Sequence, residues 1–75
     1  MGKKVEVLSE VTGSVWKLLA APGQRVAEGD TLVIVESMKM EIPIEAPCAG
    51  VVAELLCAEG QPIQEGSTAG FIEAD

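Results

Sequence analysis

Residues 13–36 read GSVWKLLAAPGQRVAEGDTLVIVE, and residues 50–73 repeat the pattern as GVVAELLCAEGQPIQEGSTAGFIE. The two stretches align without a gap at a shift of 37 residues, and 11 of the 24 aligned positions are identical. The same shift pairs Val5 with Ile42 upstream of them. Internal repeats of this kind indicate two copies of one folding unit. We therefore predict a single domain, residues 1–75, built from repeats at approximately 4–36 and 41–73.

Short apolar runs separated by turn signals predict an all-β fold. The runs rich in Val, Ile and Leu cover residues 4–7, 15–19, 31–36, 40–44, 51–56 and 70–73. Glycines and prolines fall between them too often to allow a helix of three turns. Pro43 lies inside one run, which predicts either an edge strand there or a proline nitrogen that faces away from the neighbouring strand. With about four short strands each, the halves are expected to pack face to face and bury each other's apolar side.

Composition narrows the possible functions. A chain of 75 residues with 48% hydrophobic residues, one Trp, one Phe and no His or Tyr must build a small, aliphatic core. Its net charge of −7 makes nucleic acid an unsuitable partner, because phosphate binding requires clustered Lys and Arg. Cys48 and Cys57 align with Val11 and Ala20 in the repeat, so we interpret them as small buried hydrophobic residues. Neither a metal site nor a disulfide is indicated.

The chain contains no apolar run of membrane-spanning length, and we see no signal peptide in it. We therefore expect no membrane partner and a cytoplasmic location. The sequence fits a free-standing small protein as well as the C-terminal domain of a longer one.

Lys39 occupies the junction between the two repeats, in the run Glu36-Ser37-Met38-Lys39-Met40. The flanking runs predict two antiparallel strands joined by a very tight turn with Met38 and Lys39 at its centre. Turns of two residues favour Asn-Gly, Asp-Gly or Gly-x, because their central residues need positive φ angles. Met-Lys breaks this rule, and such breaks are expected at functional sites. A wider, unstrained turn is the alternative, and either turn leaves Lys39 at an exposed tip.

An exposed lysine can serve as a point charge, a nucleophile or an attachment site. Catalytic lysines need burial or neighbouring cations, whereas Lys39 has Glu36 and Glu41 beside it. The chain also has no His and no phosphate-binding loop, so it carries no self-contained catalytic set. We predict that Lys39 is an attachment site, with an ordinary solvated lysine as the plain alternative.

The run around Lys39 resembles the biotin-attachment domain of biotin-dependent carboxylases. Three features carry the resemblance: Glu36-Ser37-Met38-Lys39-Met40 itself, Glu45-Ala46-Pro47 followed by Gly50, and the turn units Gly23-x-x-Val26-x-x-Gly29 and Gly60-x-x-Ile63-x-x-Gly66. It covers roughly residues 5–73. The resemblance implies a flattened eight-stranded barrel, or barrel-sandwich hybrid, with quasi-twofold symmetry.

The same resemblance implies a function. Lys39 would carry biotin through an amide bond to its valerate arm, and Glu36, Ser37, Met38 and Met40 would form the flanking motif. A biotin protein ligase would make the bond from biotin and ATP. The chain would then be a non-catalytic biotin carboxyl carrier, moving a carboxyl group from biotin carboxylase to a carboxyltransferase, as in acetyl-CoA carboxylase and related systems.

Two other functions stay open. Lipoyl domains share the fold but usually place Asp before and Ala after the lysine, so Met38 and Met40 favour biotin over a lipoyl or dual carrier. Outside the carrier class, the chain could be an unmodified β-barrel interaction module with a free Lys39 and an acidic surface. We interpret the methionines as adaptable apolar contacts for partners, with core packing as the alternative. Trp16 aligns with Ala53, and we expect it to pack, with a barrel-mouth or partner contact as alternatives.

Overall fold

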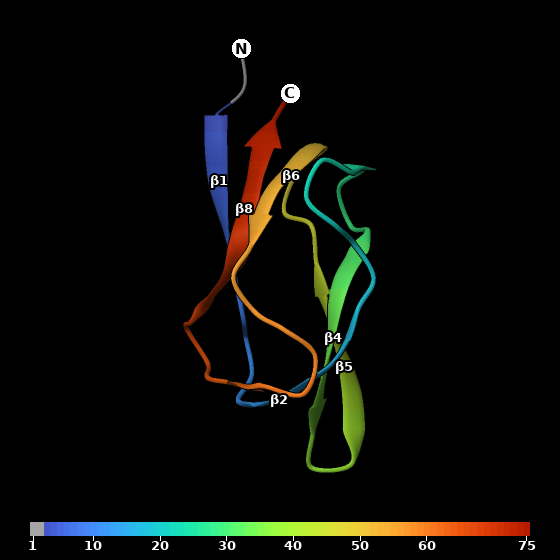
Figure 1. Cartoon of the computed structure of the whole chain (residues 1–75), viewed down its shortest axis with the longest axis vertical. Helices are drawn as coiled ribbons and strands as arrows, with labels where there is room; N and C mark the ends of the chain where they lie inside the picture. The colour runs from blue at the N-terminus through green and yellow to red at the C-terminus, as the bar shows by residue number, and fades with distance from the viewer. Residues whose placement is uncertain (1–2) are drawn as a thin grey trace.

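Two four-stranded β-sheets make up the domain in the computed structural model, which describes residues 3–75. The strands are β1 (Lys3–Leu8), β2 (Gly13–Leu18), β3 (Arg25–Val26), β4 (Thr31–Ser37), β5 (Met40–Glu45), β6 (Gly50–Leu55), β7 (Pro62–Ile63) and β8 (Thr68–Ala74). One sheet has the order β1-β8-β6-β3 and the other β5-β4-β2-β7 (Figure 1). This confirms the all-β class and the flattened, sandwich-like arrangement. Residues 3–75 contain no helix that could cross a membrane.

The sequence repeat is also a structural repeat. A shift of 37 residues carries the bounds of β1, β2, β3 and β4 onto those of β5, β6, β7 and β8. The shift also converts the strand order of one sheet into that of the other. The predicted quasi-twofold relation therefore extends from the aligned residues to the strand pairing.

The two halves do not pack as separate units, and our expectation of face-to-face halves is wrong. Each sheet takes two strands from each half, because β1 pairs with β8 and β4 pairs with β5 (Figure 1). The physical reason is that a four-strand half would leave long unpaired edges, which the strands of the other half cover.

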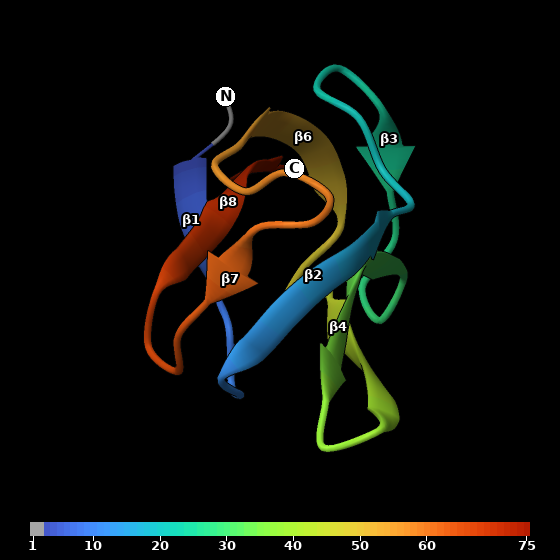
Figure 2. The same cartoon turned by 60° about the horizontal axis from the view of Figure 1, so that its bottom comes forward.

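Backbone hydrogen bonds from the turn units hold the halves together. Gly23 donates to the Val52 carbonyl at 2.7 Å, and its repeat partner Gly60 donates to the Val15 carbonyl at 2.7 Å. Both glycines have a positive φ, 89° and 86°, as the third residue of a hydrogen-bonded type II turn requires. These contacts bring the turn units against the sheets. Each turn unit contains a two-residue strand, β3 or β7, that we did not predict from the sequence (Figure 2).

Aliphatic side chains from both sheets fill the interior, as composition predicted. Six of the most deeply buried are Val15, Leu32, Val33, Val35, Val52 and Ile72. Cys48 and Cys57 are free and only partly buried, and they pack against this core. The cysteines thus act as hydrophobic residues, but at the rim of the core and not within it.

Pro43 lies on β5, the outer strand of its sheet, and is paired with Ile34 of β4. Because β5 has a neighbour on one side only, the missing amide hydrogen of proline leaves no gap in the sheet. The edge-strand prediction is confirmed. The domain is elongated, 39 by 18 by 17 Å, and the β4–β5 turn lies at the opposite end from the C-terminus (Figure 1).

Candidate attachment site at the β4–β5 turn

Met38 and Lys39 form the tight turn between β4 and β5. Ser37 pairs with Met40, so only two residues stand between the strands. Their φ angles are 51° for Met38 and 65° for Lys39, and no other non-glycine residue within 3–75 has a positive φ. This backbone is that of the two-residue hairpin turn predicted from the sequence, and the wider turn is wrong. A left-handed backbone costs a residue with a Cβ about 1–2 kcal/mol.

The side chains of the turn lie in solvent. Lys39 is exposed, and the exposed fractions of Met38 and Met40 are 92% and 63%. Core packing of the two methionines is therefore wrong. The turn presents an amine flanked by two soft apolar side chains, which suits contact with a second molecule.

Thr12 connects the base of this turn to the rest of the domain. Ser37 Oγ donates a hydrogen bond to the Thr12 carbonyl at 2.8 Å. Thr12 Oγ1 in turn accepts one from the Glu65 amide at 2.9 Å. The sequence analysis missed Thr12. A signal was present, because the repeat has Ala49 and Ala74 where the first half has Thr12 and Ser37.

Gly13 supports β4 just below the turn. A Cβ built on Gly13 would lie 2.3 Å from the Glu36 carbonyl oxygen and 3.0 Å from Val35 Cγ1. The β2 backbone therefore packs directly on β4, with no room for a side chain. Such contact limits the movement of the strand that carries the turn, so the site rests on a rigid base.

Two carboxylates flank the amine-bearing turn. Glu36 and Glu41 are exposed and pair with each other across β4 and β5. Neither carboxylate forms an ion pair with Lys39, because the ion pair found within residues 3–75 joins Arg25 to Asp75. The Lys39 amine is thus free to approach another molecule. The structure brings the five residues of the predicted motif, 36–40, together at one end of the domain.

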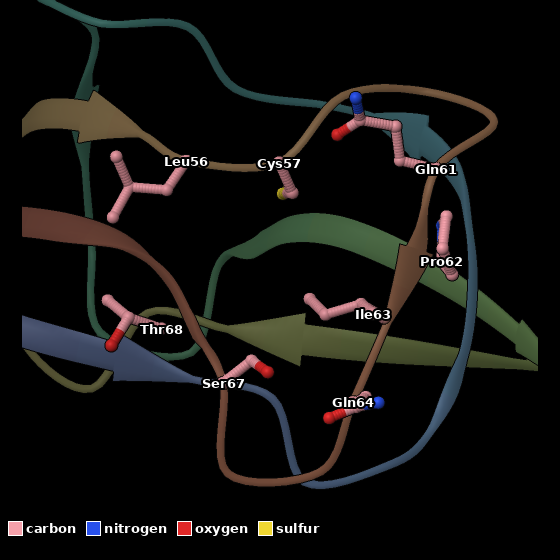
Figure 3. A pocket seen from close by; sticks show the side chains of 8 residues that line it. All are labelled: Leu56, Cys57, Gln61, Pro62, Ile63, Gln64, Ser67 and Thr68. Carbon is pink, nitrogen blue, oxygen red and sulfur yellow. The ribbon is translucent and has the colours of Figure 1, made fainter.

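A hollow of about 340 Å³ lies between the 56–57 and 61–68 segments (Figure 3). Its wall includes Cys57 and Ile63, whose side chains point into the space. Burial raises the pKa of the Cys57 thiol, which keeps it protonated at neutral pH and unsuited to nucleophilic attack. No residue of the 36–40 motif lines this hollow. The turn is therefore a surface feature separate from this hollow.

A β-sandwich that exposes one lysine on a strained two-residue turn belongs, by fold and site, to the class of attachment domains. Comparison with known families gives the same class. The biotin/lipoyl family model, described as "Biotin-requiring enzyme", matches residues 4–70. The chain belongs to this family.

Relatives by sequence include proteins of very different length. "Biotinylated protein TB7.3 homolog" of Mycobacterium leprae is 44% identical over 45 residues, which are 60% of this chain and 63% of that protein. The mitochondrial "Methylcrotonoyl-CoA carboxylase subunit alpha" of Oryza sativa subsp. japonica is 47% identical over 47 residues, which are 63% of this chain and 6% of that protein. The matches thus cover less than two thirds of either relative.

Solved structures show the same fold. The urea carboxylase of Kluyveromyces lactis contains a region that superimposes on 96% of this chain with a TM-score of 0.89 and 33% sequence identity, and this region is 6% of that protein. The chain is therefore a biotin-attachment domain of the type found in biotin-dependent carboxylases.

Proposed function

We propose that this chain is a biotin carboxyl carrier, with biotin joined to Lys39 by an amide bond. The observation that carries the proposal is the Met38–Lys39 turn, because it places both residues in a left-handed backbone and exposes the amine in a chain of the biotin-requiring family. Nothing in the packing of the sheets requires these two residue types. An attachment site accounts for them.

The proposed role is to move a carboxyl group between two enzymes. The lysine stem and the valerate arm of biotin together form a flexible tether, which raises the effective concentration of the carried group at both enzymes. The domain supplies the rigid end of that tether through Gly13 and the Thr12–Ser37 hydrogen bond. A biotin carboxylase would load the ring and a carboxyltransferase would unload it. The cytoplasmic location stays a prediction.

Intact-mass measurement tests the proposal. The chain is incubated with biotin, ATP and a purified biotin protein ligase, and Lys39→Arg serves as the control because it keeps the charge but removes the reactive amine. We expect one biotinyl addition on the unmutated chain and none on the variant. A folded chain that gains no mass would contradict biotin attachment, and the same assay with a lipoyl ligase would then separate a lipoyl carrier from an unmodified interaction module.

A further inference from the structure

The outer faces of the two sheets have matching backbones but different side chains. On the β5-β4-β2-β7 sheet, Pro43, Ile34 and Lys17 form one row across three strands. The equivalent row of the other sheet is Glu6, Phe71 and Glu54. A row with a cation and apolar residues thus corresponds to a row in which two carboxylates flank a phenylalanine.

Trp16 adds the largest difference between the faces. It lies at the β-bulge between Val15 and Lys17, its exposed fraction is 43%, and Lys17 Nζ lies 5.4 Å from the centroid of its ring. We expected Trp16 to pack, but it is about half exposed and lies outside the core. The other sheet has the same bulge with Ala53 in place of tryptophan.

The fold does not need these two side chains. Ala53 and Glu54 occupy the equivalent positions without changing the bulge or the strand pairing. An exposed tryptophan gives up the stabilisation that burial of its large ring would provide. Tryptophan is also, with tyrosine and arginine, enriched among the residues that dominate protein–protein binding energy. Trp16 and Lys17 are thus better explained by contact with a partner than by packing.

The position of this face relative to Lys39 identifies the kind of partner. Ile34 and Pro43 lie on β4 and β5, the strands that lead directly into the turn, and β2 lies beside β4 (Figure 2). A protein that approaches the turn from the outer side of β4 and β5 therefore meets this sheet. Glu36 and Glu41, between the face and the turn, add two carboxylates to the border.

We propose that Trp16, Lys17, Ile34 and Pro43, here called the Trp16 face, form the surface on which the biotin protein ligase docks. The ligase would offer an apolar pocket for the indole, with carboxylates at its rim for Lys17. This inference rests on the proposed function. The ligase is favoured over the carboxylase components because it must reach an amine on a four-carbon stem, whereas those enzymes meet a ring held further out by the valerate arm.

Ligase kinetics with matched variants test the proposal. Trp16→Ala combined with Lys17→Glu gives the Trp16 face the residues of the opposite sheet, and Glu54→Lys is the charge control on that opposite sheet. Initial rates of biotinylation are measured against carrier concentration, with ATP and biotin saturating. We expect the double variant to raise the KM for the carrier roughly tenfold and to change kcat less than about twofold, because docking is weakened while the turn is unchanged. Glu54→Lys leaves KM unchanged.

Several outcomes would overturn the proposal. A double variant with the KM of the unmutated chain would do so, even if carboxylation by a biotin carboxylase were weakened, because the face would then serve another enzyme. A lower KM for Glu54→Lys, which makes the net charge less negative where Lys17→Glu makes it more negative, would show that net charge alone matters. Circular dichroism and thermal unfolding verify that the double variant is folded, as the alanine at position 53 leads us to expect. No biotinylation of the unmutated chain would overturn both this inference and the proposed function, whereas normal biotinylation with equal KM values would overturn the inference alone.

Discussion

At one end of the domain Ser37 of β4 pairs with Met40 of β5, and at the other end Ala74 of β8 pairs with Lys3 of β1. These pairs are equivalent under the 37-residue shift. The first pair is closed by the Met38–Lys39 turn, in which both residues have a positive φ. The second pair is not joined by any turn, since β8 precedes the C-terminus.

This difference separates what the fold needs from what the site needs. The β1–β8 pair forms in the same register without a connecting turn, so the pairing does not depend on Met38 and Lys39. A turn needed for connection alone would be more stable with Asn-Gly. The strained pair is thus better explained by the side chains that it exposes, as expected where a local rule is broken at a functional position.

The largest expected effect comes from the glycines at the start of the equivalent strands β2 and β6. A Cβ at Gly13 would lie 2.3 Å from the Glu36 carbonyl oxygen, and one at Gly50 would lie 2.2 Å from that of Glu73. Gly13→Ala and Gly50→Ala should each lower the free energy of unfolding by about 3 kcal/mol, because backbone must move to make room. Denaturant titration measures both. A difference above about 1 kcal/mol between them would break the equivalence of the two ends.

A smaller effect of opposite sign is expected at the turn. Met38→Asn combined with Lys39→Gly should raise the free energy of unfolding by about 1–2 kcal/mol, because both residues then suit a left-handed backbone. The same change should abolish biotinylation in the intact-mass assay. As a control at the other end, Lys3→Gly should slightly destabilise the domain, since glycine is unfavourable in a strand. A turn variant with lowered stability would contradict the strain assigned to Met38 and Lys39.

Ser37→Ala should lower the free energy of unfolding by about 1 kcal/mol or less. The substitution removes the hydrogen bond from Ser37 Oγ to the Thr12 carbonyl and introduces the residue found at the equivalent position 74. Thermal unfolding detects the change, with the exposed Ser14→Ala as control. We also expect slower biotinylation, because the turn loses its hydrogen bond to Thr12, which is itself hydrogen-bonded to the Glu65 amide. An unchanged rate would show that Thr12 does not position the site.

The smallest effect is expected at the end opposite the turn. Arg25 and Asp75 form an exposed ion pair at 2.6 Å, and exposed pairs contribute little to stability. Arg25→Gln should change the free energy of unfolding by less than about 0.5 kcal/mol at 0.15 M salt, as denaturant titration would show. A loss of more than about 1 kcal/mol in the free energy of unfolding would mean that exposed side chains stabilise this end of the domain more than they stabilise the turn end.

The repeat made much of the fold predictable. Glycine spacing and apolar alternation place the halves in register, and the exact 37-residue offset of the strand bounds follows from them. The strained turn was predictable because Met38 and Lys39 stand where turns favour Asn and Gly. The exchange of strands between the sheets was not predictable, because the apolar pattern of a strand does not identify the strand with which it pairs. The strands β3 and β7 were missed because a strand of two residues is too short to show an alternation of apolar and polar residues.

The sequence predicts the motif of the candidate site but not the contacts that support it. Residues 36–40 were identified from sequence, and the structure places them at one end of the domain. The contribution of Thr12 depends on a backbone carbonyl and a contact 53 residues away along the chain, which local patterns do not reveal. Trp16 was misjudged because burial is the usual state of a large apolar side chain, although strand alternation places the residue after the buried Val15 on the outer face.

The most direct test of the central claim is to map the modification among the four lysines of the chain, Lys3, Lys4, Lys17 and Lys39. After reaction with biotin, ATP and a biotin protein ligase, the protein is digested and its peptides are sequenced by tandem mass spectrometry. The strained turn predicts biotin on Lys39 and none on the other three, although Lys3, Lys4 and Lys17 are also exposed. Biotin spread over several lysines would contradict the assignment of the turn as the attachment site. Biotin found on other lysines but not on Lys39 would contradict it as well.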